Sequence, residues 1–101
     1  MIRITEIYED NKMVKLRIEG KIVGPCIWDL ERLCCDYIYK KEKEVVLDLE
    51  GVTFIDNKGL HMLGGFKDNE IKLVNCSPFI RSLISSSISS NKSKSKTQKR
   101  Y

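Results

Sequence analysis

The chain is poor in the residues and segments on which several classes of function depend. Among its 101 residues there is one histidine, and none of its four cysteines lies in a Cys-x-x-Cys pair. A structural zinc site needs four nitrogen or sulfur ligands at close spacing, so we expect neither a metal site nor a cofactor. No apolar run approaches the roughly 18 residues of a membrane helix. We therefore expect no membrane insertion.

Signatures of catalysis are scarce as well. Gly64 and Gly65 are not followed by the Lys-Ser/Thr pair of a phosphate-binding loop. His61 has no nucleophile beside it in the sequence, although spacing alone leaves open a pair with one of the cysteines. We expect no enzyme activity. The four cysteines are expected to be reduced and to pack as small hydrophobic residues.

Positive charge is concentrated at one end of the chain. The formal net charge is +4, yet residues 91–101 hold five lysines or arginines and no acid, which leaves 13 basic and 14 acidic residues elsewhere. The Ser/Lys-rich end buries too little apolar surface to offset its ordering entropy. We therefore expect a domain over residues 1–88 and a disordered basic tail over 89–101. The tail can attract polyanions, but its single aromatic, Tyr101, predicts no specific nucleic-acid binding.

Hydrophobic periodicity predicts alternating strands and helices. The expected elements are strands over 2–8 and 13–19, a helix over 25–39, a strand over 45–49 that turns at Gly51 into an apolar run over 52–55, a helix over 57–66, a strand over 71–75, and a helix from 78 to about 87. Strand-helix-strand units pair in parallel, whereas the first two strands form a hairpin. The predicted fold class is α/β: a single domain with a mixed four-stranded sheet, an N-terminal antiparallel hairpin and about three helices.

Three side chains within these elements carry their own expectations. Asp48 is expected to face solvent or a loop. Thr53 is expected to be buried, which would make it a poor phosphoacceptor. Trp28 lies on the helix face opposite the apolar stripe, so it either packs under the neighbouring connector or contributes to an exposed apolar patch for a protein contact.

The polar residues 56–59 stand directly before a predicted helix. Unpaired N–H groups and the helix dipole make such a place suitable for an anion or for an acidic group of a partner. Asp56 suits an N-cap. Lys58 opposes the dipole by a few tenths of a kcal/mol, so it is either a solvated lysine or a handle for an acidic partner. Gly59 would allow the helix to pack closely on the sheet.

Several segments together resemble the STAS domain family, which comprises anti-sigma factor antagonists and related bacterial regulatory domains. The resemblance rests on VVLDLEGVTFIDNKGLHMLGGF, on IKLVNCSPFIRSLI after it, and on VKLRIEGKIVGP before it, and it covers about residues 2–87. It implies a bacterial, non-catalytic regulator that binds another protein. Because the strand pattern begins at residue 2, we expect no signal peptide and a cytoplasmic location. The implied contact surface consists of Gly24, Pro25, Asp56, Asn57, Lys58 and Gly59.

The resemblance also identifies a departure from the family. In its antagonists, a serine directly after the aspartate is phosphorylated by a kinase that is also the anti-sigma factor, and the added charge breaks the contact. The matching residue here is Asn57, which has no hydroxyl. The implied partner is a kinase-like anti-sigma factor. Alternatives are a subunit that supports a transporter ATPase and a sensor of a nucleotide or other anion. We expect a monomer or weak dimer.

Overall fold

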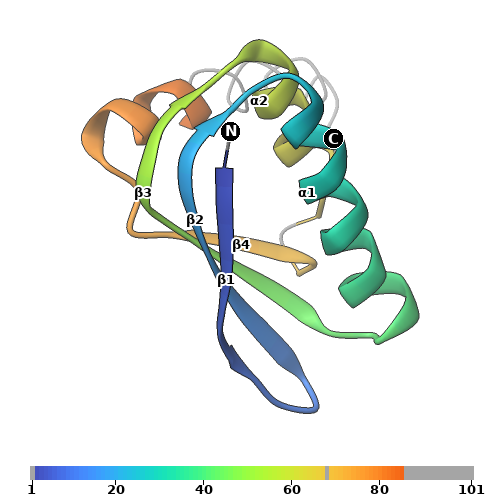
Figure 1. The fold of residues 1–101 in the computed structure, drawn as a ribbon. Helices are drawn as coiled ribbons and strands as arrows, with labels where there is room; N and C mark the ends of the chain where they lie inside the picture. The colour runs from blue at the N-terminus through green and yellow to red at the C-terminus, as the bar shows by residue number, and fades with distance from the viewer. Residues whose placement is uncertain (1, 68, 86–101) are drawn as a thin grey trace, which may run out of the picture.

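A mixed sheet forms the centre of the molecule (Figure 1), which a computed structural model describes over residues 2–67 and 69–85. Its strands are β1 (Ile2–Glu9), β2 (Met13–Ile22), β3 (Glu44–Ile55) and β4 (Ile71–Val74), and they lie in that order. β1 is antiparallel to β2, whereas β2 pairs with β3 and β3 with β4 in parallel. The predicted α/β fold with an N-terminal hairpin is confirmed.

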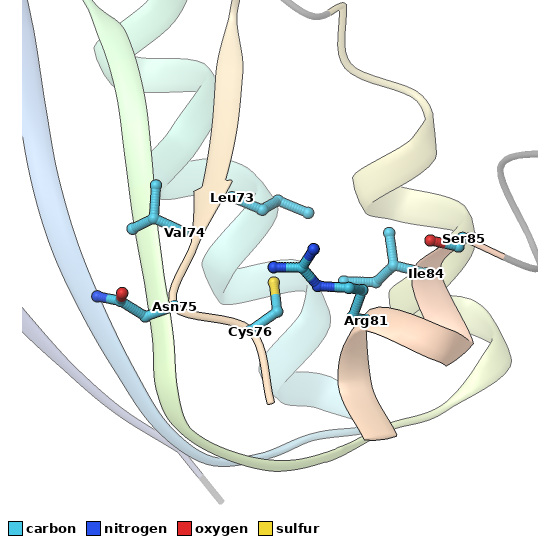
Figure 2. A pocket seen from close by; sticks show the side chains of 7 residues that line it. All are labelled: Leu73, Val74, Asn75, Cys76, Arg81, Ile84 and Ser85. Atoms are coloured by element: carbon cyan, nitrogen blue, oxygen red, sulfur yellow. The ribbon is translucent and has the colours of Figure 1, made fainter. Parts of the chain in front are cut away.

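The helices gather on one face of this sheet. α1 (Pro25–Cys35) continues as a π-helical turn, η1 (Asp36–Lys40), and α2 (Asn57–Gly64) follows β3. Right-handed crossovers between successive parallel strands place α1 and α2 on the same face, where Figure 1 shows them beside each other. Residues 78–85 are also helical. Leu73 points toward this third helix and Val74 points away from it (Figure 2). Leu73 pairs with Leu47 and packs against the core, so the third helix covers the same face of the sheet as α1 and α2.

The hydrophobic core lies between that face and the helices. Alternate residues of the central strands and one stripe from each helix are buried in it: Val14, Leu16, Ile18, Val45, Leu47, Leu49, Leu30, Cys34, Leu63 and Ile80. Each buried Leu, Ile or Val side chain stabilises the fold by roughly 1.5–3 kcal/mol relative to an exposed one. Burial, with smaller effects from Cys35 and Glu31, raises the pKa of the Cys34 thiol to about 12. This thiol therefore packs as a hydrophobic group.

The prediction of a turn at Gly51 is wrong, because β3 continues through that residue without interruption. The ladder with β2 shifts register there, between Arg17 and Glu19. Glu19 lies opposite Gly51, and a Cβ atom on Gly51 would come within 2.7 Å of the Glu19 Cγ atom. The glycine therefore makes room for a cross-strand neighbour and does not end the strand.

Asp48 is only 2% exposed, so of its two expected surroundings, solvent or a loop, solvent is wrong. It lies on the face of the sheet opposite the helices, directly across from Arg17, whose Nε atom is 3.8 Å away. The Glu50 N–H donates a 3.0 Å hydrogen bond to it. Burial opposes ionisation, but the hydrogen bonds from Glu50 and Asn75 and the charge of Arg17 hold the pKa of Asp48 below its usual value. Its own strand, the neighbouring strand β2 and the loop after β4 thus satisfy this carboxylate.

Thr53 is exposed, which corrects the expectation that it is buried. Gly20 pairs with Val52 and the next residue of β2 pairs with Phe54, so Thr53 is the extra residue of an irregular step in the ladder. For that reason the Thr53 side chain does not follow the alternation of buried and exposed side chains along β3. Its hydroxyl donates a 3.4 Å hydrogen bond to the Gly20 carbonyl oxygen.

The remaining element boundaries differ by only a few residues. β2 extends to Ile22, three residues past its predicted end, and α2 ends at Gly64, two residues before its predicted end. The last predicted helix is described as far as residue 85. The expected domain boundary at residue 88 and the tail over 89–101 lie outside the described residues.

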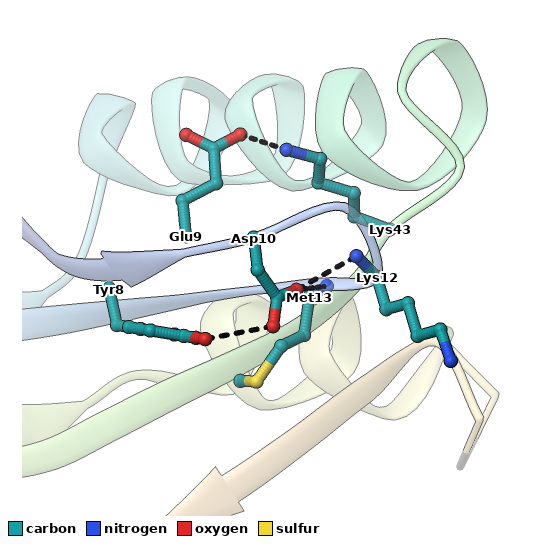
Figure 3. Close-up of polar contacts among 6 residues, drawn as sticks. All are labelled: Tyr8, Glu9, Asp10, Lys12, Met13 and Lys43. Carbon is teal, nitrogen blue, oxygen red and sulfur yellow. Dashed lines mark hydrogen bonds and ion pairs between the residues drawn. The ribbon is translucent and has the colours of Figure 1, made fainter.

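Polar contacts close the far end of the hairpin (Figure 3). Asp10 accepts hydrogen bonds from the N–H groups of Lys12 and Met13, at 2.8 and 2.9 Å. Beside it, Lys43 forms a partly buried ion pair with Glu9. Lys43 lies just before β3, so this pair joins the edge strand β1 to the connection between helix and strand.

We predict that Glu9→Gln weakens the acid sensitivity of the fold. The hydrogen bond from Lys43 lowers the pKa of Glu9 in the folded protein, so the unfolded chain binds this proton more readily. The contribution of Glu9 to stability is therefore present above its unfolded pKa and is lost as the pH falls through the folded value. Urea unfolding at about pH 7 and about pH 3 should show a smaller loss of stability for Glu9→Gln than for the wild type.

A matched control for this measurement is Glu50→Gln. The Glu50 side chain is exposed and takes part in none of the ion pairs found among residues 2–67 and 69–85. This variant should keep the pH dependence of the wild type. An equal loss of stability in Glu9→Gln and the wild type would contradict the assignment.

Candidate functional site

One carboxylate joins the two loops that sequence analysis singled out. Asp56 is the N-cap of α2, and the Gly59 N–H donates a 2.8 Å hydrogen bond to its Oδ1 atom. Its Oδ2 atom accepts a longer hydrogen bond, 3.4 Å, from the N–H of Gly24. Gly24 directly precedes α1, so Asp56 holds the start of one helix against the start of the other.

The parallel pairing of β2 and β3 explains why these loops meet. Ile22 at the end of β2 pairs with Ile55 at the end of β3, so both chains leave the sheet at the same edge. The Asp56 N–H donates to the Ile22 carbonyl oxygen at 3.2 Å and continues the ladder by one step. α1 and α2 consequently begin at the same end of the sheet (Figure 1).

Gly24 and Pro25 set the direction in which α1 leaves this edge. Gly24 has φ 58° and ψ −139°, a conformation that residues with a side chain rarely adopt. No atom outside its chain neighbours lies within 4 Å of the position a Cβ would take, so the backbone angle alone favours glycine. Pro25 follows at the first turn of α1, where its missing N–H removes no helical hydrogen bond.

Two neighbouring hollows lie between the starts of the two helices. The smaller, about 220 Å³, is lined by Gly24, Pro25, Ile27, Trp28 and Lys58. The larger, about 510 Å³, is lined by Ile27, Trp28, Glu31, Asn57, Lys58 and His61. We call Gly24, Pro25, Trp28, Asn57 and Lys58 the α1–α2 surface. Four of the six residues expected to contact a partner belong to it. Asp56 supports it from behind as the shared cap.

Gly59 is buried and lies behind this surface. A Cβ atom at this position would come within 2.7 Å of the Ile55 Cγ2 atom and 3.1 Å of the Ile22 carbonyl oxygen. Its role is therefore the close packing of α2 on the ends of β2 and β3.

The two alternatives left open for Trp28 are resolved by its exposure. Trp28 is 75% exposed, so it does not pack under the connector. It extends outward from the first turns of α1 between the two hollows. Lys58 is exposed on the α2 side, and none of the ion pairs in the described part of the chain includes it. The surface thus combines a large aromatic side chain with a cation that lacks an acidic partner there.

Within residues 2–67 and 69–85, no three His, Cys, Asp or Glu side chains are grouped so that they would hold a metal ion. In the same ranges, no helix has the length and apolar character needed to cross a membrane.

A separate hollow of about 280 Å³ lies at the carboxyl end of β4 (Figure 2), and sequence reasoning missed it. It is lined by Leu73, Val74, Asn75, Cys76, Arg81, Ile84 and Ser85. Burial raises the pKa of the Cys76 thiol, and Arg81 offsets part of this effect. The tendency of ligands to bind at the carboxyl ends of parallel strands is the signal that would have drawn attention to this edge.

Comparisons with known proteins agree on the fold. A family model described as "STAS domain" matches residues 4–93. Among nine matching chains of solved structures is one described as "Structure of the Anti-Sigma Factor Antagonist SpoIIAA in its Unphosphorylated Form". The match has a TM-score of 0.67 and 16% sequence identity, and it covers 80% of each chain. At this identity the likeness shows a shared fold. No curated protein matches the chain.

We predict that Gly59→Ala destabilises the protein by about 1–3 kcal/mol, because the added methyl group overpacks the contact between α2 and the sheet. Gly65→Ala is the matched control. The atom nearest to a Cβ at Gly65 would be the Met62 carbonyl oxygen at 3.4 Å, and φ there is −80°. It should change stability by less than about 0.5 kcal/mol. Urea denaturation compares the two variants, and equal stabilities would rule out the tight packing described for Gly59.

Proposed function

The chain belongs to the STAS domain family, and from this premise we propose that it is a non-catalytic regulator that binds another protein through the α1–α2 surface. We further propose that it acts in the bacterial cytoplasm, without a cofactor, as a monomer or weak dimer.

The observation that carries this proposal is the bridge made by Asp56. Its carboxylate accepts N–H groups from both Gly24 and Gly59, so two segments more than thirty residues apart form one preorganised surface. The exposed Trp28 on that surface supports a protein partner, since exposed aromatic residues are enriched among the residues that dominate protein interfaces. A surface held in place by the fold also loses little conformational entropy on binding.

Regulation should differ from that of relatives with a phosphorylated serine. Asn57, at the position that resembles the phosphoacceptor, is exposed and carries a neutral amide. An amide does not accept a phosphoryl group in the way a hydroxyl does, and it lacks the charge by which phosphoserine repels a partner. We infer that the partner is bound constitutively or is released by some other signal.

Two classes of partner fit the proposal. The shared fold with a protein described as an anti-sigma factor antagonist favours a kinase-like anti-sigma factor. The loss of the serine favours a transporter ATPase, because a supporting subunit does not need the phosphorylation switch. We propose the anti-sigma factor first and the ATPase as the second candidate.

A sensor of nucleotides or other anions is less favoured by the geometry. The N–H of Gly59, which an anion at the start of α2 would use, already donates to the Asp56 carboxylate. That carboxylate adds negative charge at the point where an anion would bind. The helix start is therefore capped from within the chain.

We predict that affinity capture with the full chain recovers one of the two partner classes, and that Lys58→Glu lowers the recovery at least about tenfold. The expected loss follows from placing a negative charge at the centre of the contact. Lys21→Glu is the matched control, because Lys21 is exposed on β2 outside the α1–α2 surface. Mass spectrometry identifies and quantifies the partner. Recovery that is equal for wild type, Lys58→Glu and Asn57→Ala would count against this surface as the binding site.

We also predict that Asn57→Ser creates a phosphorylation site if the recovered partner is a kinase-like anti-sigma factor. After incubation with the partner and ATP, intact-protein mass spectrometry should show one added phosphoryl group on Asn57→Ser and none on the wild type or on Asn57→Ala. Thr53 is exposed, so peptide mapping must distinguish the two positions. Phosphorylation of the wild type at Thr53 would show that a switch persists at another residue.

A further inference from the structure

The single tryptophan of the chain is left in water at the proposed contact surface. Trp28 is 75% exposed, although it belongs to a helix in which Ile27 and Leu30 are buried and Leu33 packs partly buried against the core. Packing within the domain therefore does not explain why a tryptophan occupies this position in α1. An exposed tryptophan offers a partner a large apolar area at low entropic cost, and truncation of such a residue has large effects at protein interfaces.

The hollow beside Trp28 has apolar walls and one charge. Pro25, Ile27 and Trp28 line it, and among residues 2–67 and 69–85 the one charged residue that lines it is Lys58. A partner that covers this hollow removes the Lys58 ammonium group from water. Burial of a cation without an opposite charge is costly, so the covering segment must supply an anionic group next to its apolar one. No acid within the described residues forms an ion pair with Lys58, and Asp56 already accepts two backbone N–H groups.

The charged residues around the larger hollow determine the orientation in which a partner segment can bind. Glu31 lines it from α1, whereas Lys58 and His61 line it from α2. A carboxylate near Glu31 would be repelled, so the acidic group of the partner belongs on the α2 side. A donor of the partner, such as a backbone N–H, belongs on the Glu31 side.

Resting on the proposed function, we propose that the partner binds with a segment in which an acidic side chain lies next to a large apolar one. The apolar side chain fills the hollow against Trp28, and the carboxylate pairs with Lys58. This assigns the chemistry of the partner and makes Trp28 and Lys58 the residues that determine affinity and specificity.

The test uses the full chain and a library of random 12-residue peptides displayed on phage. Peptides selected on the wild type are synthesised and titrated while the emission of Trp28 is recorded. Because the chain has one tryptophan, a change in emission on titration with a peptide that itself lacks tryptophan reports on this surface. Selected peptides should carry Asp or Glu within about three residues of Leu, Ile, Phe, Tyr or Met, and binding should shift the emission to shorter wavelength as Trp28 loses contact with water.

Variants separate the two parts of the proposal. Trp28→Ala has no tryptophan emission to follow, so its binding and that of the wild type are compared by isothermal titration calorimetry; it should weaken the selected peptides about 30-fold, the factor expected for truncation of a dominant interface residue. Lys58→Glu should weaken them at least about tenfold and, used as a new target, should select peptides rich in Lys or Arg. Tyr39→Ala and Lys21→Glu are the controls, because Tyr39 is 62% exposed at the other end of the same helical segment and Lys21 is exposed on β2. Both should bind as the wild type does.

Several outcomes would overturn this inference. Selected peptides without acidic residues, affinities unchanged by Lys58→Glu, or a selection that yields no peptide able to shift Trp28 emission would each contradict it. The proposed function can survive such a result, since a partner recovered by affinity capture and sensitive to Asn57→Ala would still bind this surface by other chemistry. Conversely, acidic-apolar peptides that depend on Lys58, found where no protein partner is recovered, would support the surface chemistry and refute the wider role.

Discussion

The arrangement of the candidate site depends on a single shared hydrogen-bond acceptor, the carboxylate of Asp56. One oxygen caps α2 through the Gly59 N–H, and the other holds the Gly24 N–H of the loop before α1. Without this carboxylate, two helix starts would have to be positioned separately at the edge of the sheet. Because the Asp56 carboxylate accepts hydrogen bonds from backbone N–H groups, the charge that a partner meets at this surface is that of Lys58. The fold thus sets the electrostatic character of the surface as well as its shape.

Parallel pairing of β2 and β3 makes that shared acceptor possible. Their ends coincide at Ile22 and Ile55, and α2 approaches this corner closely only because Gly59 has no side chain. The same crossovers place α1 and α2 on one face of the sheet, so each helix packs on the sheet while Trp28, Asn57 and Lys58 near the helix starts stay exposed. The same two helices thus supply residues to the core and to the α1–α2 surface. Rigid packing in the core therefore helps to keep the surface preorganised for binding.

Much of the fold follows from local patterns in the sequence, and the errors share one cause. Periodicity and turn residues predicted the strands, the helices and the hairpin, and the position of residues 56–59 before a helix identified half of the site. Gly51 and Thr53 were misjudged, and the burial of Asp48 was missed, because their environments come from cross-strand neighbours: Glu19 over Gly51, Arg17 beside Asp48, and a register step at Thr53. The sequence likewise could not decide whether Trp28 is covered, since that depends on where the loop before α1 lies.

The backbone of Gly24 has a consequence for how this surface can change in evolution. Its φ of 58° and ψ of −139° exclude nearly every other residue, and Gly59 is equally restricted by the atoms around it. Asn57 and Lys58, between the cap and the packed glycine, are exposed and carry no such restriction. Mutations can therefore accumulate at these two positions with little loss of stability while the scaffold beneath them is preserved. A lineage with this arrangement can change the chemistry of the exposed surface through one or two substitutions.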